Sequence, residues 1–283
     1  GDKGGLEVAR DFDGTTGALR SAISPNLVRP WIVSIWFKFD ADHTTPKTIW
    51  ARQNSGTPAV TYCALKTYPE NIAGTWYIYP RYTVSIDSGD SGTGYARATI
   101  ALSANTWYHA TIWENTGLND RAIWINGANK GTNAVSKAGM GTTTHTVLGA
   151  LETVTITPTY SEFFDGQVAE LCEWDNTDGA GGEFLSQTAT EPLALSLYQS
   201  RLKPAWYRPN ACRYTRFLRD EDKSLSMPSS SGVSPSAFTA YGTTAVAEHP
   251  AIGDLWVPQR WRHLVSSSSV VPVLMRHYRQ RRQ

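Results

Sequence analysis

Apolar and polar residues alternate along several short stretches of the chain, and this period of two predicts β-strands. In Trp31–Asp40 every second residue is large and apolar, and we expect this set to face a core: Trp31, Val33, Ile35, Phe37 and Phe39. Trp107–Trp113 and Arg121–Asn126 alternate in the same way on either side of Glu114–Asp120. That loop is rich in Asn, Gly and Asp, so the three stretches together predict a β-hairpin.

Both faces of the predicted hairpin carry large apolar side chains. Trp107 and Trp113 lie on one face of its first strand, and Ile112 lies on the other. An inner strand of a sandwich has this pattern when its outer face is covered by another element or by a partner. We expect Trp107 to lie in the sandwich core, close to Ile123 or Ile125.

Four stretches carry a family resemblance. Asp11–Gly14 reads D-F-D-G, Val33–Phe37 contains S-I-W, the predicted hairpin ends in an Asn-Gly turn, and Phe164–Leu171 reads F-D-G-Q-V-A-E-L. In this order the set resembles the laminin-G-like jelly roll of the concanavalin A superfamily, over residues 6–185. The resemblance implies an all-β, antiparallel jelly-roll β-sandwich. The superfamily includes lectins, enzymes, adhesion modules and virion proteins, so the fold alone does not give the function.

An extension with a short helix should follow the sandwich. Glu191-Pro192 is expected to open the helix, because proline favours the first helical position, and Pro204 marks its end. The motifs Arg208-Pro209 and Val246–Pro250 resemble an extension that follows this jelly roll in tailed-phage proteins. We therefore divide the chain into a jelly-roll β-sandwich (1–185), a helix with an irregular extension packed on it (186–251) and a C-terminal arm (252–283).

The aromatic segment Thr75–Ile86 contains a candidate glycan or partner surface. Its alternation places Tyr77, Tyr79 and Arg81 together on one face, opposite an apolar face. Aromatic rings stack on sugars and anchor protein partners. The same residues also fit a packing surface covered by the C-terminal extension, and we favour that interpretation. Pro80 donates no ladder hydrogen bond, which predicts an edge position or a bulge.

The C-terminal arm has a composition of its own. No acidic residue follows Asp254, and apolar groups are followed by a run of arginines. The candidate anchoring residues are Trp256, Trp261, Leu274, Arg276, Arg279, Arg281 and Arg282. Apolar burial and the enrichment of arginine at interfaces favour an arm that lies across a neighbouring subunit. A nucleic-acid role is not expected, because the arm lacks the wider basic face of such a binder.

Composition narrows the choice of partners and cofactors. The net charge is +1 and no apolar run is long enough to span a bilayer, so we expect no nucleic acid and no membrane as partners. The three cysteines lack paired spacing, which disfavours a disulfide framework or a zinc site. The loop Asp87–Gly94 holds two carboxylates, which are too few for calcium. We predict no metal and no other cofactor.

Three carboxylates near the end of the sandwich, Glu170, Glu173 and Asp175, raise the question of a glycosidase. Their order is E-x-x-E-x-D, whereas the glucanases of the fold that the chain resembles carry E-x-D-x-(x)-E. An odd spacing also places Glu170 and Glu173 on opposite faces of a strand. We therefore expect no catalytic residues and no enzyme activity. His109 is expected to be a hydrogen-bonded core or rim group rather than a base.

These observations support two hypotheses from different classes. The first is a non-enzymatic virion structural protein that decorates or cements a phage-like capsid through its C-terminal arm, with or without glycan binding. Its partners would be capsid-shell proteins and copies of itself, and it would assemble in the host cytoplasm. The alternative is a lectin-type carbohydrate-binding or adhesion module on a virion tail or a cell surface. A glycan array distinguishes the two.

Overall fold

The computed structural model describes residues 8–21, 30–53, 62–85, 94–115, 121–133, 143, 145–154, 158–176, 186–199, 212–215, 225–226 and 238–248. All of them belong to the compact unit formed by Gly1–Pro250.

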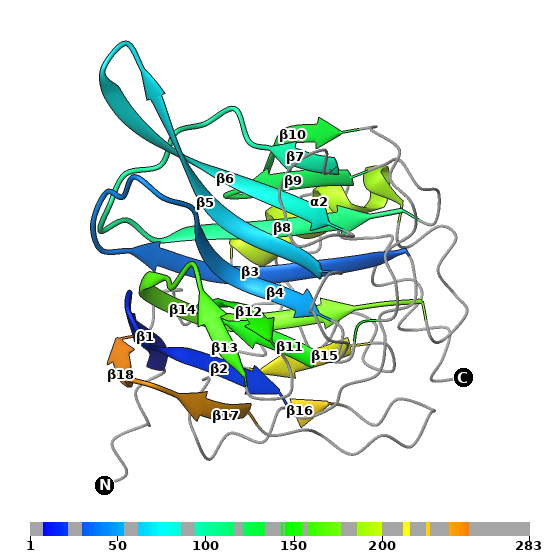
Figure 1. The fold of residues 1–283 in the computed structure, drawn as a ribbon. Coiled ribbons are helices and arrows are strands. Elements are labelled where there is room, and N and C mark those ends of the chain that lie inside the picture. The colour runs from blue at the N-terminus through cyan, green and yellow to red at the C-terminus, as the bar shows by residue number, and fades with distance from the viewer. Residues whose placement is uncertain are drawn as a thin grey trace, which may run out of the picture. The chain divides into compact units, whose positions relative to one another are not determined.

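Two large antiparallel sheets face each other and form the sandwich (Figure 1). Sheet A contains, in spatial order, β10 (Ala128–Asn133), β9 (Arg121–Ile125), β8 (Tyr108–Glu114), β3 (Trp31–Phe39), β14 (Asp165–Trp174), β1 (Val8–Asp13) and β18 (Thr244–Glu248). On the same sheet, β15 (Cys212–Thr215) pairs with the second half of β14, and β16 (Leu225–Ser226) pairs with β15. Sheet B contains β17 (Phe238–Tyr241), β2 (Ala18–Ser21), β11 (His145–Leu148), β4 (Lys47–Gln53), β5 (Tyr62–Ile72), β6 (Thr75–Ser85) and β7 (Gly94–Arg97). The all-β jelly-roll sandwich predicted from the sequence is confirmed.

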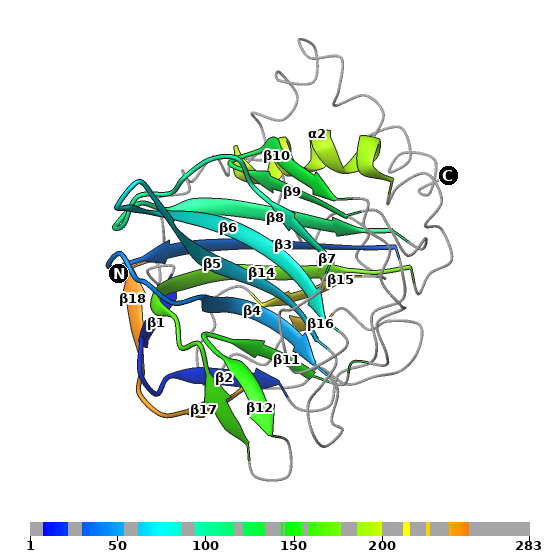
Figure 2. The same cartoon turned by 45° about the horizontal axis from the view of Figure 1, so that its top comes forward.

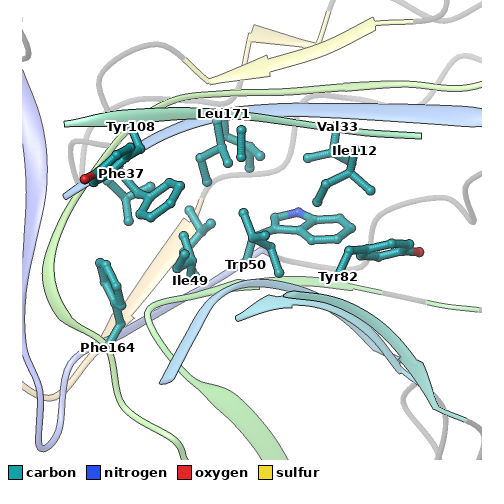
Figure 3. Packing of buried hydrophobic residues seen from close by; sticks show 14 of the residues in the cluster. Val33, Phe37, Ile49, Trp50, Tyr82, Tyr108, Ile112, Phe164 and Leu171 are labelled. Carbon is teal, nitrogen blue, oxygen red and sulfur yellow. The ribbon is translucent and has the colours of Figure 1, made fainter. Parts of the chain in front are cut away.

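The core lies between the two sheets, as Figure 3 shows for side chains of both. The alternating set predicted for β3 is buried there in full: Trp31, Val33, Ile35, Phe37 and Phe39. Trp31 meets sheet B directly, because its ring centre lies 6.0 Å from that of Trp50 and 5.7 Å from that of Tyr82. Each large apolar side chain that is fully buried stabilises the fold by about 1.5–3 kcal/mol.

Trp107 does not belong to this core, so that prediction is wrong. β8 begins one residue later, at Tyr108, and its core residues are Tyr108, Ala110 and Ile112. Trp107 is only half-buried, and the Lys38 ammonium lies 5.9 Å from its ring centre. Because β8 is apolar on both faces, the alternation alone did not tell its core face from the face that a helix covers.

The covering element is α2 (Gln187–Tyr198), which lies along β8, β9 and β10 of sheet A (Figure 2). Its Tyr198 stacks on Trp36 at 5.9 Å between ring centres. Gly127, in the turn between β9 and β10, has a positive φ, and a Cβ there would lie 2.8 Å from the Cα of Leu195. A glycine is therefore what lets the helix approach the turn. No helix in the described part of the chain is long and apolar enough to cross a bilayer.

The helix begins earlier than its proline predicts. Ser186 caps it, with its hydroxyl accepting a hydrogen bond from the Ala189 N–H at 3.1 Å, so Pro192 lies inside the helix rather than at its start. A serine cap satisfies a free amide of the first turn. The helix start indicated by Ser186 therefore conflicts with the later start indicated by Pro192.

The extension after the helix is more regular than expected. β18 pairs with β1 in sheet A, and β17 pairs with β2 in sheet B, so one strand pair completes the same edge of both sheets. The β17–β18 turn also bonds to the β1–β2 turn, through the Thr243 N–H and the Thr16 hydroxyl at 3.1 Å. The sequence also predicts a short strand at Ala237–Tyr241, which β17 confirms, but β18 and the pairing of both strands with the sandwich edge were missed.

Two segments shape the outer face of sheet B. β12 (Leu151–Val154) and β13 (Thr159–Ser161) form a separate two-stranded sheet, and Leu151 packs there on Ala51 and Ala64. The β5–β6 hairpin runs out beyond the other strands (Figure 1). β12 and β13 thus cover the outer face of sheet B near β4, while the outer face of β6 and β7 (Gly94–Arg97) carries tyrosines and arginines.

Candidate functional site

One face of β5, β6 and β7 points away from the core and carries tyrosines and arginines. Strand register fixes its members, because residues opposite each other share a face: Tyr68 lies opposite Tyr79, and Arg81 lies opposite Arg97. The alternate residues of β6 belong to the core: Ile78, Tyr82 and Val84. We name the outward set the tyrosine–arginine face; it consists of Tyr68, Tyr77, Tyr79, Arg81, Tyr95 and Arg97.

Arg81 is the centre of this face. Its guanidinium carbon lies 4.5 Å from the ring centre of Tyr68 and 3.8 Å from that of Tyr95, so it contacts rings from both neighbouring strands. Arg81 is only 9% exposed. Contacts of a cation with ring faces are favourable, and they gain strength where water is removed. Arg81 therefore holds the two rings in place from the middle strand.

Arg97 makes a second contact of the same kind. Its guanidinium carbon lies 3.9 Å from the ring centre of Tyr79, and one terminal nitrogen donates to the Glu70 carboxylate at 2.5 Å. Both charged side chains keep about a third of their surface exposed. Arg97 thus links a ring of β6 to a carboxylate of β5.

Lys66 marks the limit of the face toward β12 and β13. It lies opposite Arg81 on β5, is fully buried, and pairs with the Glu162 carboxylate at 3.0 Å. Glu162 also accepts a hydrogen bond from the Thr48 hydroxyl at 2.7 Å. The residues around β13 therefore cover this end of the face, and the other end is left to the β5–β6 hairpin.

The tip of the hairpin is exposed on both of its faces. Ala73 and Gly74 form the turn with positive φ values, and Ile72, Trp76 and Tyr77 are all exposed. The register places Tyr77 opposite Glu70, on the tyrosine–arginine face, and Trp76 opposite Asn71, on the reverse face. Trp76 is therefore a natural control for experiments on Tyr77.

Pro80 is not in a bulge, but it lies just outside the β6–β7 ladder, which ends at Arg81, so on that side it has the edge position that was predicted. β6 pairs with β5 in one continuous register, and Pro80 lies opposite Thr67. The Pro80 carbonyl accepts from the Ala98 N–H at 2.9 Å, just beyond the end of β7. An N–H at Pro80 would point to this same side, so proline cannot give the reciprocal bond to Ala98, and the β6–β7 ladder ends here.

The carboxylates inside the sandwich belong to buried ion pairs. Glu114 accepts from Arg121 Nε at 2.9 Å and from the Tyr82 hydroxyl at 2.8 Å. Burial and the neighbouring Glu114 raise the pKa of Tyr82 well above its usual value. Glu173 accepts from the Trp50 indole N–H at 2.9 Å and lies 3.8 Å from Arg52. Both carboxylates have the environment of structural groups that tie the two sheets together.

The geometry around Glu170 differs from that expected. The register of β14 against β3 shifts between Ala169 and Cys172, and Glu170 within this bulge has a φ of 49°. A bulge breaks the alternation of faces, so the odd spacing of Glu170 and Glu173 does not decide their orientation. What separates them is that Glu173 lies inside the sandwich, whereas Glu170 is only half-buried.

His109 is a hydrogen-bonded core group, as predicted. It is buried on the outer face of sheet A under α2, and its Nε2 lies 2.8 Å from the Ser34 hydroxyl. Its ring centre is 5.0 Å from that of Trp36. Burial lowers the pKa of His109 from 6.5 to about 3. The imidazole is therefore neutral at physiological pH.

The structure brings the predicted residues Tyr77, Tyr79 and Arg81 together on one face, and Tyr77 is 39% exposed. The C-terminal extension that was expected to cover this face lies mostly outside the described residues, so that interpretation stays a prediction. Sequence reasoning missed Tyr68, Tyr95 and Arg97, although Tyr-x-Glu in β5 and Tyr-x-Arg in β7 repeat the spacing of β6. The arm residues lie outside the described residues, as does most of the loop 87–94. Within the described ranges, no group of three or more His, Cys, Asp and Glu could hold a metal ion.

Comparison with known proteins gives matches in structure alone. No protein-family model matches the chain, and no curated protein matches it. A heptameric SAP-like pentraxin from Limulus polyphemus is similar with a TM-score of 0.56 and 15% identity, over 88% of this chain and 98% of the pentraxin. A putative carbohydrate-binding protein from Bacteroides ovatus has a TM-score of 0.49 and 13% identity, over 87% of this chain and 61% of that one.

Domains LG4-5 of the mouse laminin α1 chain give a TM-score of 0.42 and 14% identity, over 58% of this chain and 41% of that one. At these identities the match to the pentraxin shows the fold alone. The jelly-roll sandwich is therefore shared with known proteins, and the function has to be argued from the residues of this chain.

Proposed function

We propose that the protein is a carbohydrate-binding module that holds glycans, without catalysis, on the tyrosine–arginine face. The observation that carries this proposal is the exposure of Tyr77 and Tyr95, at 39% and 38%, beside rings held in place by arginines. Tyrosine presents a large, rigid ring at low cost in conformational entropy. The face is therefore prepared to bind a flat ligand.

Sugars fit the chemistry of this face. A pyranose ring has an apolar face of C–H groups that packs on an aromatic ring, and hydroxyl groups around its edge that need hydrogen-bond partners. Tyr77 and Tyr95 offer the rings, while Arg97 and Glu70 offer partly exposed donors and acceptors beside them. Ligand sites commonly combine apolar surface with a few well-placed polar groups.

A protein partner fits the same face less well. The core of a protein interface is depleted in charged residues, whereas rings and charges alternate across this face from Tyr68 and Arg81 to Tyr79 and Arg97. Among the described residues of this face, Ile72 at the hairpin tip is the exposed aliphatic side chain. Alternation of rings and charges favours a small polar ligand.

The absence of catalysis is part of the proposal. Glycosidases need two carboxylates on either side of a bound sugar. Glu114 and Glu173 are instead buried in ion pairs with Arg121 and Arg52. We expect no release of reducing sugar from any glycan that the protein binds.

A glycan array followed by titration calorimetry tests the proposal. The protein should bind a defined subset of glycans, and Tyr77→Ala and Tyr95→Ala should each weaken binding about fivefold, since a ring contact contributes roughly 1 kcal/mol. Trp76→Ala is the matched control, because it removes an equally exposed ring from the reverse face of the same hairpin. If Trp76→Ala abolished binding and Tyr77→Ala did not, the proposed face would be the wrong one.

The virion hypothesis stays a prediction from the sequence, as do its capsid partners and its location. It depends on the C-terminal arm, which lies outside the described residues. Truncation after Gly253 tests it directly, because a decoration protein anchored by the arm should stop joining its particle while the sandwich still folds. Full incorporation of the truncated chain would contradict the anchoring role.

A further inference from the structure

Three cations lie in a row across the strands that form the tyrosine–arginine face. Lys66 of β5 lies opposite Arg81 of β6, and Arg81 lies opposite Arg97 of β7. Like charges directly opposite each other destabilise a sheet. Such a row therefore needs carboxylates to balance it.

Two carboxylates of the described residues pair with the outer cations of this row. Lys66 pairs with Glu162 at 3.0 Å, and Arg97 pairs with Glu70 at 2.5 Å. Arg81, between them, contacts the rings of Tyr68 and Tyr95, and no carboxylate in the described part of the chain forms an ion pair with it. Within the described ranges, the outer two cations are thus neutralised by carboxylates, and the central one is not.

The surroundings of Arg81 make this imbalance costly. Arg81 is only 9% exposed, and its Nε has no hydrogen-bond acceptor within the described residues. A guanidinium carries five N–H donors in one plane. The rings of Tyr68 and Tyr95 stabilise the charge, but ring faces do not replace the oxygen acceptors that its N–H groups need. Buried charges are normally paired and hydrogen-bonded.

We infer that the ligand of the tyrosine–arginine face is an acidic glycan, whose carboxylate or sulfate group pairs with Arg81 while its sugar rings stack on the neighbouring tyrosines. The inference rests on the proposed function and names the class of glycan. An arginine whose guanidinium lies over two rings has restricted freedom, and its fork suits a two-oxygen acceptor such as a carboxylate or a sulfate. The anion would supply the negative charge that completes the row.

The experiment compares acidic glycans with their neutral counterparts. Hexagalacturonate and its methyl ester have the same sugar rings, and only the first is charged; a sulfated galacto-oligosaccharide and its desulfated form make a second pair. The wild-type protein should bind the charged member of at least one pair about tenfold more tightly, because ionic hydrogen bonds are roughly twice as strong as neutral ones. The two pairs separate carboxylate from sulfate recognition.

Arg81→Gln should remove this preference, lowering affinity for the charged glycan about tenfold and for the neutral one less than twofold. Arg81→Lys keeps the charge without the planar fork, and should retain part of the preference. Because Arg81 also supports two rings, thermal unfolding of each variant is measured alongside. A lower melting temperature with unchanged preference would assign Arg81 a structural role alone.

Tyr95→Glu and Tyr95→Gln give a test that leaves Arg81 in place. Both remove the same ring from a position that is more than a third exposed, but only glutamate supplies a carboxylate next to Arg81. Glutamate should weaken binding of the acidic glycan about tenfold more than glutamine does, and the two variants should bind a neutral glycan equally.

The outcomes separate this inference from the proposed function. Binding of neutral and acidic glycans with equal affinity, unchanged in Arg81→Gln, would overturn the inference and leave a carbohydrate-binding module. A preference for acidic glycans that depends on Arg81 would support both. Failure to bind any glycan, on an array that includes the acidic pairs, would overturn both.

Discussion

The interior of the sandwich and the outer face of sheet B use the same residue types in different ways. Inside, Arg121 points at Glu114, and the hydroxyl of Tyr82 donates to the same carboxylate. Outside, Arg81 and Arg97 lie over the faces of tyrosine rings. Carboxylates are the centres of the interior clusters, whereas a cation is the centre of the outer face.

This difference separates structure from recognition. In a buried ion pair each charge is paired with its partner inside the protein, away from any ligand. The outer face keeps rings exposed and one cation without a carboxylate among the described residues. Variants of the interior should therefore change stability, and variants of the face should change binding.

The largest effect on stability is expected from Glu114→Ala. It removes the carboxylate from a buried pair, leaves Arg121 without that partner, and deprives the Tyr82 hydroxyl of its acceptor. Breaking a buried pair in this way costs about 3–5 kcal/mol. Glu70→Ala on the outer face, where the pair with Arg97 is about one-third exposed, should cost less than about 1 kcal/mol. Denaturant titration of both variants checks the contrast, and equal losses would contradict it.

Two tryptophans sharpen the contrast further. Trp50 is fully buried and bonds Glu173, so Trp50→Ala should destabilise the fold by about 3–5 kcal/mol. Trp107 is half-buried with Lys38 near its ring, and Trp107→Ala should cost about 1 kcal/mol or less. A thermal melt in which Trp107→Ala is the more damaging variant would place Trp107 in the core after all.

Lowering the pH should reduce the stability contributed by buried groups such as His109 more than that contributed by the outer face. Burial lowers the pKa of His109 from 6.5 to about 3, so the unfolded chain takes up a proton at a higher pH than the folded protein does. The stability contributed by this residue is thus present above pH 6.5 and is lost as the pH falls toward 3, by about 2 kcal/mol between pH 7 and pH 5.

His109→Gln provides the measurement. Glutamine does not titrate and retains an amide that can bond Ser34, so the variant should lose about 2 kcal/mol less than the wild type over that pH range. Tyr77→Ala is the control, because its pH dependence should match that of the wild type. An unchanged slope in His109→Gln would show that other groups cause the acid sensitivity.

The smallest effect on stability is expected on the face itself. Tyr77→Ala should change the free energy of unfolding by less than about 0.5 kcal/mol, because exposed side chains contribute little to folding. The same variant should weaken glycan binding, as proposed above. A large loss of stability together with a loss of binding would make Tyr77 a structural residue, and its use as a probe of recognition would fail.

Alternation in the sequence was enough to predict the parts of the fold in which one face is clearly apolar. The core face of β3 and the pair β8 and β9 were predicted in this way. Trp107 was misplaced because both faces of its strand are apolar, and the start of α2 was missed because Ser186 caps the helix before Pro192. These errors arise where two local signals compete, so tertiary contacts decide.

The candidate site was predictable in part for the same reason. Alternation within β6 brought Tyr77, Tyr79 and Arg81 together, because it needs no knowledge of other strands. Tyr68 could have been added, since the short Ala-Gly turn fixes the register of β5 against β6. Tyr95 lies on β7, which follows a longer loop. A loop of that length does not fix the register of β7 against β6, so the sequence alone could not place Tyr95 on this face. The ring contacts of Arg81 therefore required the structure.

The most direct test is nuclear magnetic resonance of the protein with labelled tyrosine rings, titrated with the tightest-binding glycan of the array. The account predicts that the ring signals of Tyr68, Tyr77, Tyr79 and Tyr95 shift together, while those of Tyr108 and Tyr160, on other parts of the sandwich, do not. Saturable shifts confined to rings outside β5, β6 and β7 would contradict the central claim that this face is where the protein binds its ligand.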